Sequence, residues 1–205
     1  MRALLLAAIL GSFAAAATAA PSGDIPMVAI GLPFAPETPR PVAATHPLYR
    51  RVEVSEIEDL PTTVGSSALN FIAAAKRSSV NSALRESFQR MNLLSDTSSD
   101  GRFRLTIKWL GSHTPFRIAT HNSATSSFHY RLARIDNGQV LFDRDVTTSA
   151  DGGGVDASMR DNGILRASIA ANFASAANCL DHAAYGTAPD DCALTPKFSV
   201  LVERR

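Results

Sequence analysis

The sequence is poor in cysteine and has no excess of charge of either sign. Its 205 residues include two cysteines, one tryptophan, and 20 Lys and Arg against 19 Asp and Glu. A general nucleic-acid-binding protein needs a basic surplus to release counterions from phosphates, so the charge balance argues against that class. The 45% hydrophobic content excludes wholesale disorder. The length suits one domain with appendages.

Long apolar runs are missing beyond the first twenty residues. Met1 and Arg2 give a positive start, residues 3–17 are uncharged and apolar, and Ala17-Thr18-Ala19 matches a cleavage pattern. These features predict a signal peptide over residues 1–19, cleaved near Ala19, and a periplasmic or secreted protein. The alternative is a membrane anchor over residues 3–20, which would be short and weakly hydrophobic. We expect no transmembrane span in the mature chain.

The cysteines are confined to the C-terminal part of the chain. No cysteine precedes Cys179, so a lipoprotein signal is absent. Cys179 and Cys192 form an isolated pair, which in an oxidising compartment favours a disulfide. The alternative is a metal site that includes His182 and neighbouring aspartates, but the spacing matches no zinc pattern.

Seven prolines lie within residues 20–47, which we interpret as an extended leader. Its apolar residues could dock on the core or on a partner, and a polyproline ligand is a further alternative. Residues 48–205 then form a single domain that ends in the disulfide tail.

Within this domain, hydrophobic periodicity predicts helices and strands. We expect strands near 49–57, 102–109, 128–133 and 140–146, helices over 79–94 and 156–180, and a final strand near 197–202. Ser79 is the expected N-cap, and Asp136-Asn137-Gly138 the hairpin turn. Loops are expected at 61–67, 111–122 and 151–154, whereas 68–75 is ambiguous. The fold class is therefore α+β: a two-layer sandwich with two amphipathic helices on one face of a largely antiparallel sheet of 3–5 strands. The other sheet face is polar.

Four segments carry a resemblance to a known family. They are ALRESFQRMNLLS (83–95), GRFRLTIKWLG (101–111), SFHYRLARIDNGQVLFDRDVTTS (127–149) and ILRASIAANFASA (164–176). Over residues 50–180 the chain resembles small exported envelope proteins of proteobacteria, mostly lipoproteins, with a layout similar to LptE-type lipopolysaccharide-assembly lipoproteins. It departs from them in lacking the lipobox cysteine, in its Cys179/Cys192 tail and in its 151–159 connector. The resemblance implies an envelope function and transfers no functional residue.

Motifs of catalysis, metal binding or cofactor binding are missing, so we assign no such residues. His113, His121 and His129 are eight residues apart and should not converge on one ion. Asp143 and Asp145 alternate along one strand near Arg131, which is more typical of an exposed charge ladder than of an acid–base pair. Glycines 152–154 lack the residues of a phosphate-binding loop and are interpreted as a connector.

One candidate surface remains, a basic sheet face that could meet lipid phosphates or an acidic partner. Its members are Arg102, Arg104, Lys108, Arg131 and Arg144. The alternative is that these residues only keep the protein soluble.

The leading hypothesis is a non-catalytic periplasmic accessory protein that binds an envelope protein complex or a lipid headgroup, and that assists lipid or lipopolysaccharide assembly or transport. The alternatives are a small secreted hydrolase or envelope acyl or glycosyl transferase without a recognisable motif, and a purely structural, disulfide-stapled protein.

The disulfide gives the first testable prediction. In denaturant, an alkylating reagent should label neither cysteine before reduction and both after it. Cys192→Ser should lower the free energy of unfolding by roughly 3 kcal/mol, because the loop is no longer closed in the unfolded chain. Labelling of both thiols in the unreduced protein would contradict the pairing.

Overall fold

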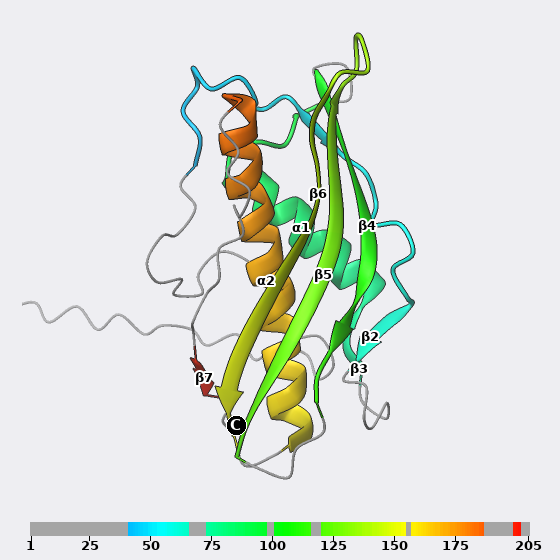
Figure 1. The fold of residues 1–205 in the computed structure, drawn as a ribbon, viewed down its shortest axis with the longest axis vertical. Helices are drawn as coiled ribbons and strands as arrows, with labels where there is room; N and C mark the ends of the chain where they lie inside the picture. The colour runs from blue at the N-terminus through cyan, green and yellow to red at the C-terminus, as the bar shows by residue number, and fades with distance from the viewer. Residues whose placement is uncertain are drawn as a thin grey trace, which may run out of the picture.

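The computed structural model describes residues 41–65, 73–97, 101–115, 120–154, 157–186 and 199–201. Two helices and seven strands follow one another in these ranges (Figure 1). In chain order they are β1 Val52–Val54, β2 Thr63–Gly65, β3 Ala73–Lys76, α1 Arg77–Arg90, β4 Phe103–His113, β5 His121–Arg134, β6 Val140–Gly153, α2 Ala157–Ala184 and β7 Ser199–Leu201.

The main sheet has the strand order β1-β4-β5-β6-β7. Its long central strands β4, β5 and β6 are antiparallel neighbours, while the three-residue strands β1 and β7 pair in parallel at the two edges. Strands β2 and β3 form a separate antiparallel pair. The predicted α+β class, with two helices and a largely antiparallel sheet, is confirmed.

The helices cover one face of this sheet and leave the other face open (Figure 1). Alternation along the strands sends Leu105, Phe128 and Leu132 into the core, and all three are fully buried. Helix α2 lies along β5 and β6, and every residue from 167 to 177 is buried. A single apolar stripe was expected, but the middle of α2 is enclosed on all sides, which its many alanines and serines permit.

The central hairpin is longer than the sequence pattern indicated. Residues 121–122 were expected in a loop and 151–153 in a glycine-rich connector, yet they pair as the ends of β5 and β6. At Gly153 a Cβ atom would lie 3.0 Å from the His121 ring, so a larger residue there would require that ring to shift slightly. The pattern was missed because serines, threonines and glycines replace the apolar residues that mark a strand.

Two further expectations near α1 are wrong. The helix begins at Arg77 with Lys76 as its N-cap residue, which makes no side-chain capping hydrogen bond, so Ser79 lies in the first turn instead. The expected loop near 61–67 and the ambiguous stretch after it contribute the β2–β3 pair.

Residues 42–48 pack against the domain, although the leader was expected to extend to residue 47. Val42 and Leu48 are buried, and the Val42 N–H donates to the Met91 carbonyl over 3.0 Å. The His46 ring is buried and accepts a hydrogen bond at Nδ1 from the Leu48 N–H. Its Nε2 lies 2.8 Å from Asp181 Oδ1 on α2, an ion-pair distance without hydrogen-bond alignment. This contact holds the segment to the end of α2.

Several predictions lie outside the described residues. These are the signal peptide, most of the leader and Cys192. Cys179 itself is fully buried on α2, and its pairing with Cys192 stays a prediction. Within the described ranges, no helix is long and apolar enough to cross a membrane.

A buried polar network joins α2 to the sheet. The Tyr130 hydroxyl donates to Asn172 Oδ1 over 2.7 Å, and Asn172 Nδ2 donates to the carbonyls of Ser126 and Val146 over 3.2 and 2.7 Å. Both side chains are fully buried. Because an unmatched polar group would be costly there, the network fixes how far along the sheet α2 lies.

Tyr130 gives a pH-dependent prediction. Burial raises the pKa of its phenol well above the ordinary value. Only the unfolded chain can therefore ionise this group just above pH ~10, and stability falls there by up to about 1.4 kcal/mol per pH unit. Tyr130→Phe should remove this part of the alkaline slope. It should also lower stability at neutral pH by about 1–2 kcal/mol, because Asn172 loses a donor.

Denaturant titrations from pH 8 to 12 on both proteins would measure the effect, with Tyr185→Phe as the exposed control. Parallel pH profiles for the wild-type protein and Tyr130→Phe would contradict the prediction.

Candidate functional site

The open face of the sheet carries a ladder of charged side chains. The register aligns Lys108 of β4 with His129 of β5 and Asp145 of β6, and places Arg131 of β5 opposite Asp143 of β6. These residues are exposed or half-buried, because alternation turns them away from the helices.

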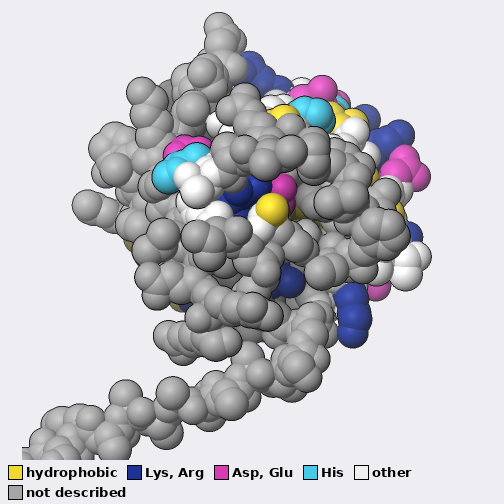
Figure 2. Space-filling model, turned by 90° about the horizontal axis from the view of Figure 1, so that it is seen from below, with side chains coloured by type: hydrophobic (Ala, Val, Ile, Leu, Met, Phe, Trp, Pro, Cys, Tyr) yellow, Lys and Arg dark blue, Asp and Glu magenta, His cyan; other side chains and the backbone are white. Residues whose placement is uncertain are grey.

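Each cation at the centre of this face lies near a carboxylate. Arg104 is 3.5 Å from Glu53, and Lys108 is 3.2 Å from Asp59. Arg131 is 3.8 Å from Asp143. Seen from below, basic and acidic side chains also stand side by side over the described surface (Figure 2). The face is therefore charged but nearly neutral.

His129 lies between the carboxylates of Asp143 and Asp145 and contacts both. Its Nε2 lies 2.9 Å from Asp143 Oδ1, and its Nδ1 lies 2.8 Å from Asp145 Oδ1. Both contacts are donated at once only when both ring nitrogens carry a proton. Asp143 and Asp145 thus form the ladder that the sequence predicted, and each has one oxygen within 2.9 Å of the His129 ring.

The five residues of the predicted basic face do not share one surface. Arg104, Lys108 and Arg131 lie on the open face, and Arg102, which directly precedes β4, follows the same alternation at the end of that face. Arg144 follows the alternation of Phe142 and Val146, so it projects to the helix side, opposite Tyr130. The three histidines are also apart along the sheet, since His113 pairs with Thr125, His121 with Gly153 and His129 with Lys108.

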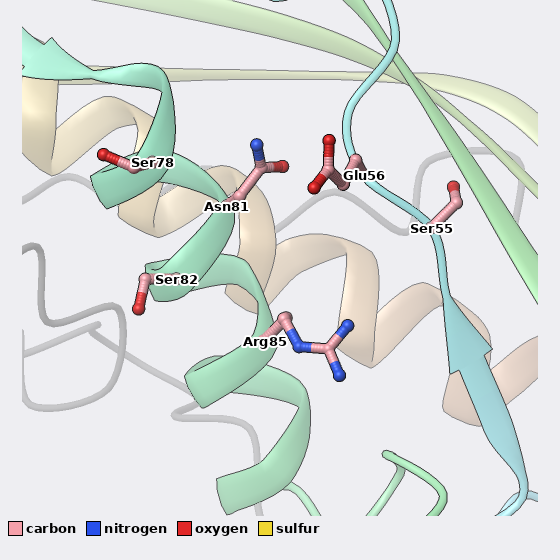
Figure 3. Close-up of a pocket in the computed structure, with 6 residues that line it drawn as sticks. All are labelled: Ser55, Glu56, Ser78, Asn81, Ser82 and Arg85. Atoms are coloured by element: carbon pink, nitrogen blue, oxygen red, sulfur yellow. The ribbon is translucent and has the colours of Figure 1, made fainter. Parts of the chain in front are cut away.

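A polar pocket of about 460 Å³ lies between α1 and the segment after β1 (Figure 3). Its lining consists of Ser55, Glu56, Ser78, Asn81, Ser82 and Arg85. In the close-up, Asn81 and Glu56 point toward one another, whereas Ser78 and Ser82 point away from the segment. The sequence does not reveal this pocket, because α1 and the segment after β1 are distant in sequence and share no motif.

The polar groups of the pocket mainly hold the backbone. Ser55 Oγ donates to the Leu105 carbonyl over 3.1 Å, and Asn81 Oδ1 accepts from the Ile57 N–H over 3.0 Å. Arg85 donates to the Val54 carbonyl over 3.4 Å. These bonds tie the segment after β1 to both α1 and β4, so the pocket is first of all a structural joint.

The joint predicts contrasting effects for two neighbouring residues. Asn81→Ala should lower the free energy of unfolding by about 1–3 kcal/mol, because the N–H of buried Ile57 loses its acceptor. Ser82→Ala, at an exposed position in the same pocket, should change it by less than about 0.5 kcal/mol. Chemical denaturation measures both, and equal effects would contradict the assigned role of Asn81.

Comparison with known proteins reveals likeness at the level of the fold. No family model matches the sequence, and no curated protein matches it. The structure is similar to the protein XCC0632 from Xanthomonas campestris, family DUF330, with a TM-score of 0.51 and 10% identity over 75% of this chain and 93% of that one.

Two weaker matches are the hypothetical protein CT253 from Chlamydia trachomatis and the lipoprotein GNA1162 from Neisseria meningitidis. The first has a TM-score of 0.45 and 12% identity over 66% of this chain and 97% of the other. The second has a TM-score of 0.23 and 17% identity over 40% of this chain and 63% of the other. Neither score is high enough to bear on the fold. The chain therefore shares its fold with the Xanthomonas protein, and the likeness to LptE-type proteins stays a prediction.

Proposed function

We propose that this chain is a non-catalytic accessory protein of the cell envelope, which acts in the periplasm by binding through the open face of its sheet. The observation that carries the proposal is the asymmetry of the sheet. One face is covered by two helices, while the other presents an ordered array of charged and hydroxyl side chains on three long strands. Such a rigid, pre-formed surface suits recognition, because little side-chain freedom is lost on binding.

The paired charges favour a protein partner over a lipid headgroup on this face. Lys108, His129 and Arg131 each lie near a carboxylate, so an isolated phosphate would compete with partners already in place. A protein surface of alternating charge matches such a ladder. Assistance in lipid or lipopolysaccharide assembly is the finer part of the proposal, and it rests on the resemblance and the predicted export.

The alternative of a hydrolase or transferase would require a nucleophile and a base that meet in a cavity. The pocket beside α1 is the natural place to look for them. There the Ser55 hydroxyl and the Asn81 oxygen are engaged with backbone groups, which favours the structural role.

Site-directed photocrosslinking in the native envelope tests the proposal. A photoreactive amino acid is placed at Thr147, an exposed position of β6 on the open face, and separately at Gln89, an exposed position of α1. We expect a discrete adduct from position 147 in the envelope fraction and none from position 89. Recovery of the uncrosslinked protein from both positions would overturn the proposal.

A further inference from the structure

The end of the molecule beyond the sheet face differs from it in charge. At this hairpin end, the β5–β6 turn, the start of β4, residues 47–51 and the end of α2 lie together (Figure 1, top). Arg51, Arg102 and Arg134 are placed here by backbone contacts. The Arg102 N–H donates to the Arg51 carbonyl over 2.9 Å, and Arg134 pairs with Phe103 at the start of β4.

Within the part of the chain that the structure describes, these three arginines form no ion pair, unlike the cations of the sheet face. Among the described residues, none of the three has an ion-pair partner, whereas neighbouring Arg50 lies 3.1 Å from Asp96. The Arg134 guanidinium lies over the Phe103 ring, 5.8 Å from its centroid. Asp136 in the turn and Asp181 near the end of α2 offset part of this positive charge.

Exposed apolar side chains gather at the same end. The large hydrophobic residues exposed in the described ranges are Leu110, Ile135, Val140 and Tyr185, at 46, 41, 39 and 60% exposure. Ile135 and Val140 flank the hairpin turn, and Tyr185 follows α2 with its ring against His46. Scattered single residues of this kind are normal on a surface, but here three of the four lie at one end of the molecule.

A shallow groove of about 190 Å³ lies at the same end. It is lined by Pro47, Leu48, Phe103, Arg134, Leu141 and Ala184. The hairpin end therefore combines exposed apolar side chains, an apolar groove and three arginines that form no ion pair with another described residue.

We propose that the hairpin end docks on the surface of an anionic lipid bilayer. The three arginines would meet lipid phosphates, which accept paired hydrogen bonds from guanidinium groups. Ile135 and Val140 would enter the boundary between headgroups and acyl chains, and Tyr185 would lie in the interfacial layer that favours its amphipathic ring. Charge complementarity favours the lipid surface, because arginines that have no ion-pair partner in the described ranges, near exposed apolar side chains, match phosphates above hydrocarbon. This surface lies at one end of the sheet, beyond the charge ladder of Lys108, His129 and Asp145, and its test does not depend on the proposed function.

Vesicle flotation tests the proposal with the protein purified as the cell processes it. Vesicles of phosphatidylethanolamine and phosphatidylglycerol at 3:1 are compared with vesicles of phosphatidylcholine alone. We expect binding to the anionic vesicles that weakens with added salt, and little binding to the neutral ones. Arg102→Gln and Arg51→Gln should each reduce the partition coefficient about five-fold. Ile135→Asp/Val140→Asp should reduce it at least ten-fold.

Matched controls lie on the sheet face. Leu110→Asp changes an equally exposed apolar residue, and Arg104→Gln removes an arginine that has a carboxylate neighbour. Both should bind vesicles like the wild type, and thermal melts should show that every variant is folded.

Binding that all the variants retain equally, or no binding to anionic vesicles, would overturn the proposal. A protein adduct from a photocrosslinker at Ile135, without vesicle binding, would likewise overturn it in favour of a protein partner. Neither result would affect the crosslinking outcome at Thr147.

Discussion

The contact of α2 with the long antiparallel strands is the constraint on which the rest of the structure depends. The helix provides residues small enough to lie close to the sheet, and the middle of it is enclosed on all sides. Apolar packing alone would allow α2 to shift along the sheet, because one alanine contact can replace another. The hydrogen bonds of Asn172 with Tyr130, Ser126 and Val146 remove that freedom. If α2 were shifted along the sheet, the buried Asn172 amide would lose its hydrogen-bond partners, which is costly in the interior.

Covering one face of the sheet so completely leaves the polar alternate residues on the other face. Along most of β4, β5 and β6 the side chains alternate, so residues directed at α2 have neighbours directed at solvent, and most of these neighbours are polar. The charges there are arranged across strands, with Lys108, His129 and Asp145 in one row. Opposite charges in register stabilise the sheet modestly and also keep it from attracting anions. The same physics that makes a stable face therefore makes a poor phosphate site, which separates the sheet face from the hairpin end.

The sequence allowed the main architecture to be predicted, because Phe103, Leu105 and Ile107 alternate and Val80, Leu84 and Phe88 recur at helical spacing. The lower half of the hairpin escaped prediction. Its buried positions hold Ser126 and Thr148, which bond to each other across the strands, and Thr148 also donates to the Ser168 carbonyl of α2. A serine or threonine can be recognised as buried only when its hydrogen-bond partners are known. Those partners come from distant parts of the chain. The pocket beside α1 escaped for the same reason.

The Xanthomonas protein has a similar fold at only 10% identity, because the residues that form the core and the residues that form the surface are under different constraints. A fold of this type requires alternation on three strands, two covering helices and a turn, and many sequences satisfy those demands. Surface charge is almost free to vary under them, because substitutions such as those at Arg51 or Asp143 leave the core untouched. The shared fold consequently explains how the core is packed. The choice of binding partner depends instead on where charged and apolar side chains are exposed on the surface. In this chain, exposed arginines and exposed apolar side chains occur together at the hairpin end, where Arg102 and Arg134 lie beside Ile135. Neutral pairing on the face and unneutralised charge at the end are independent features, and a scaffold that contacts a protein along its length and a membrane at its tip would need both.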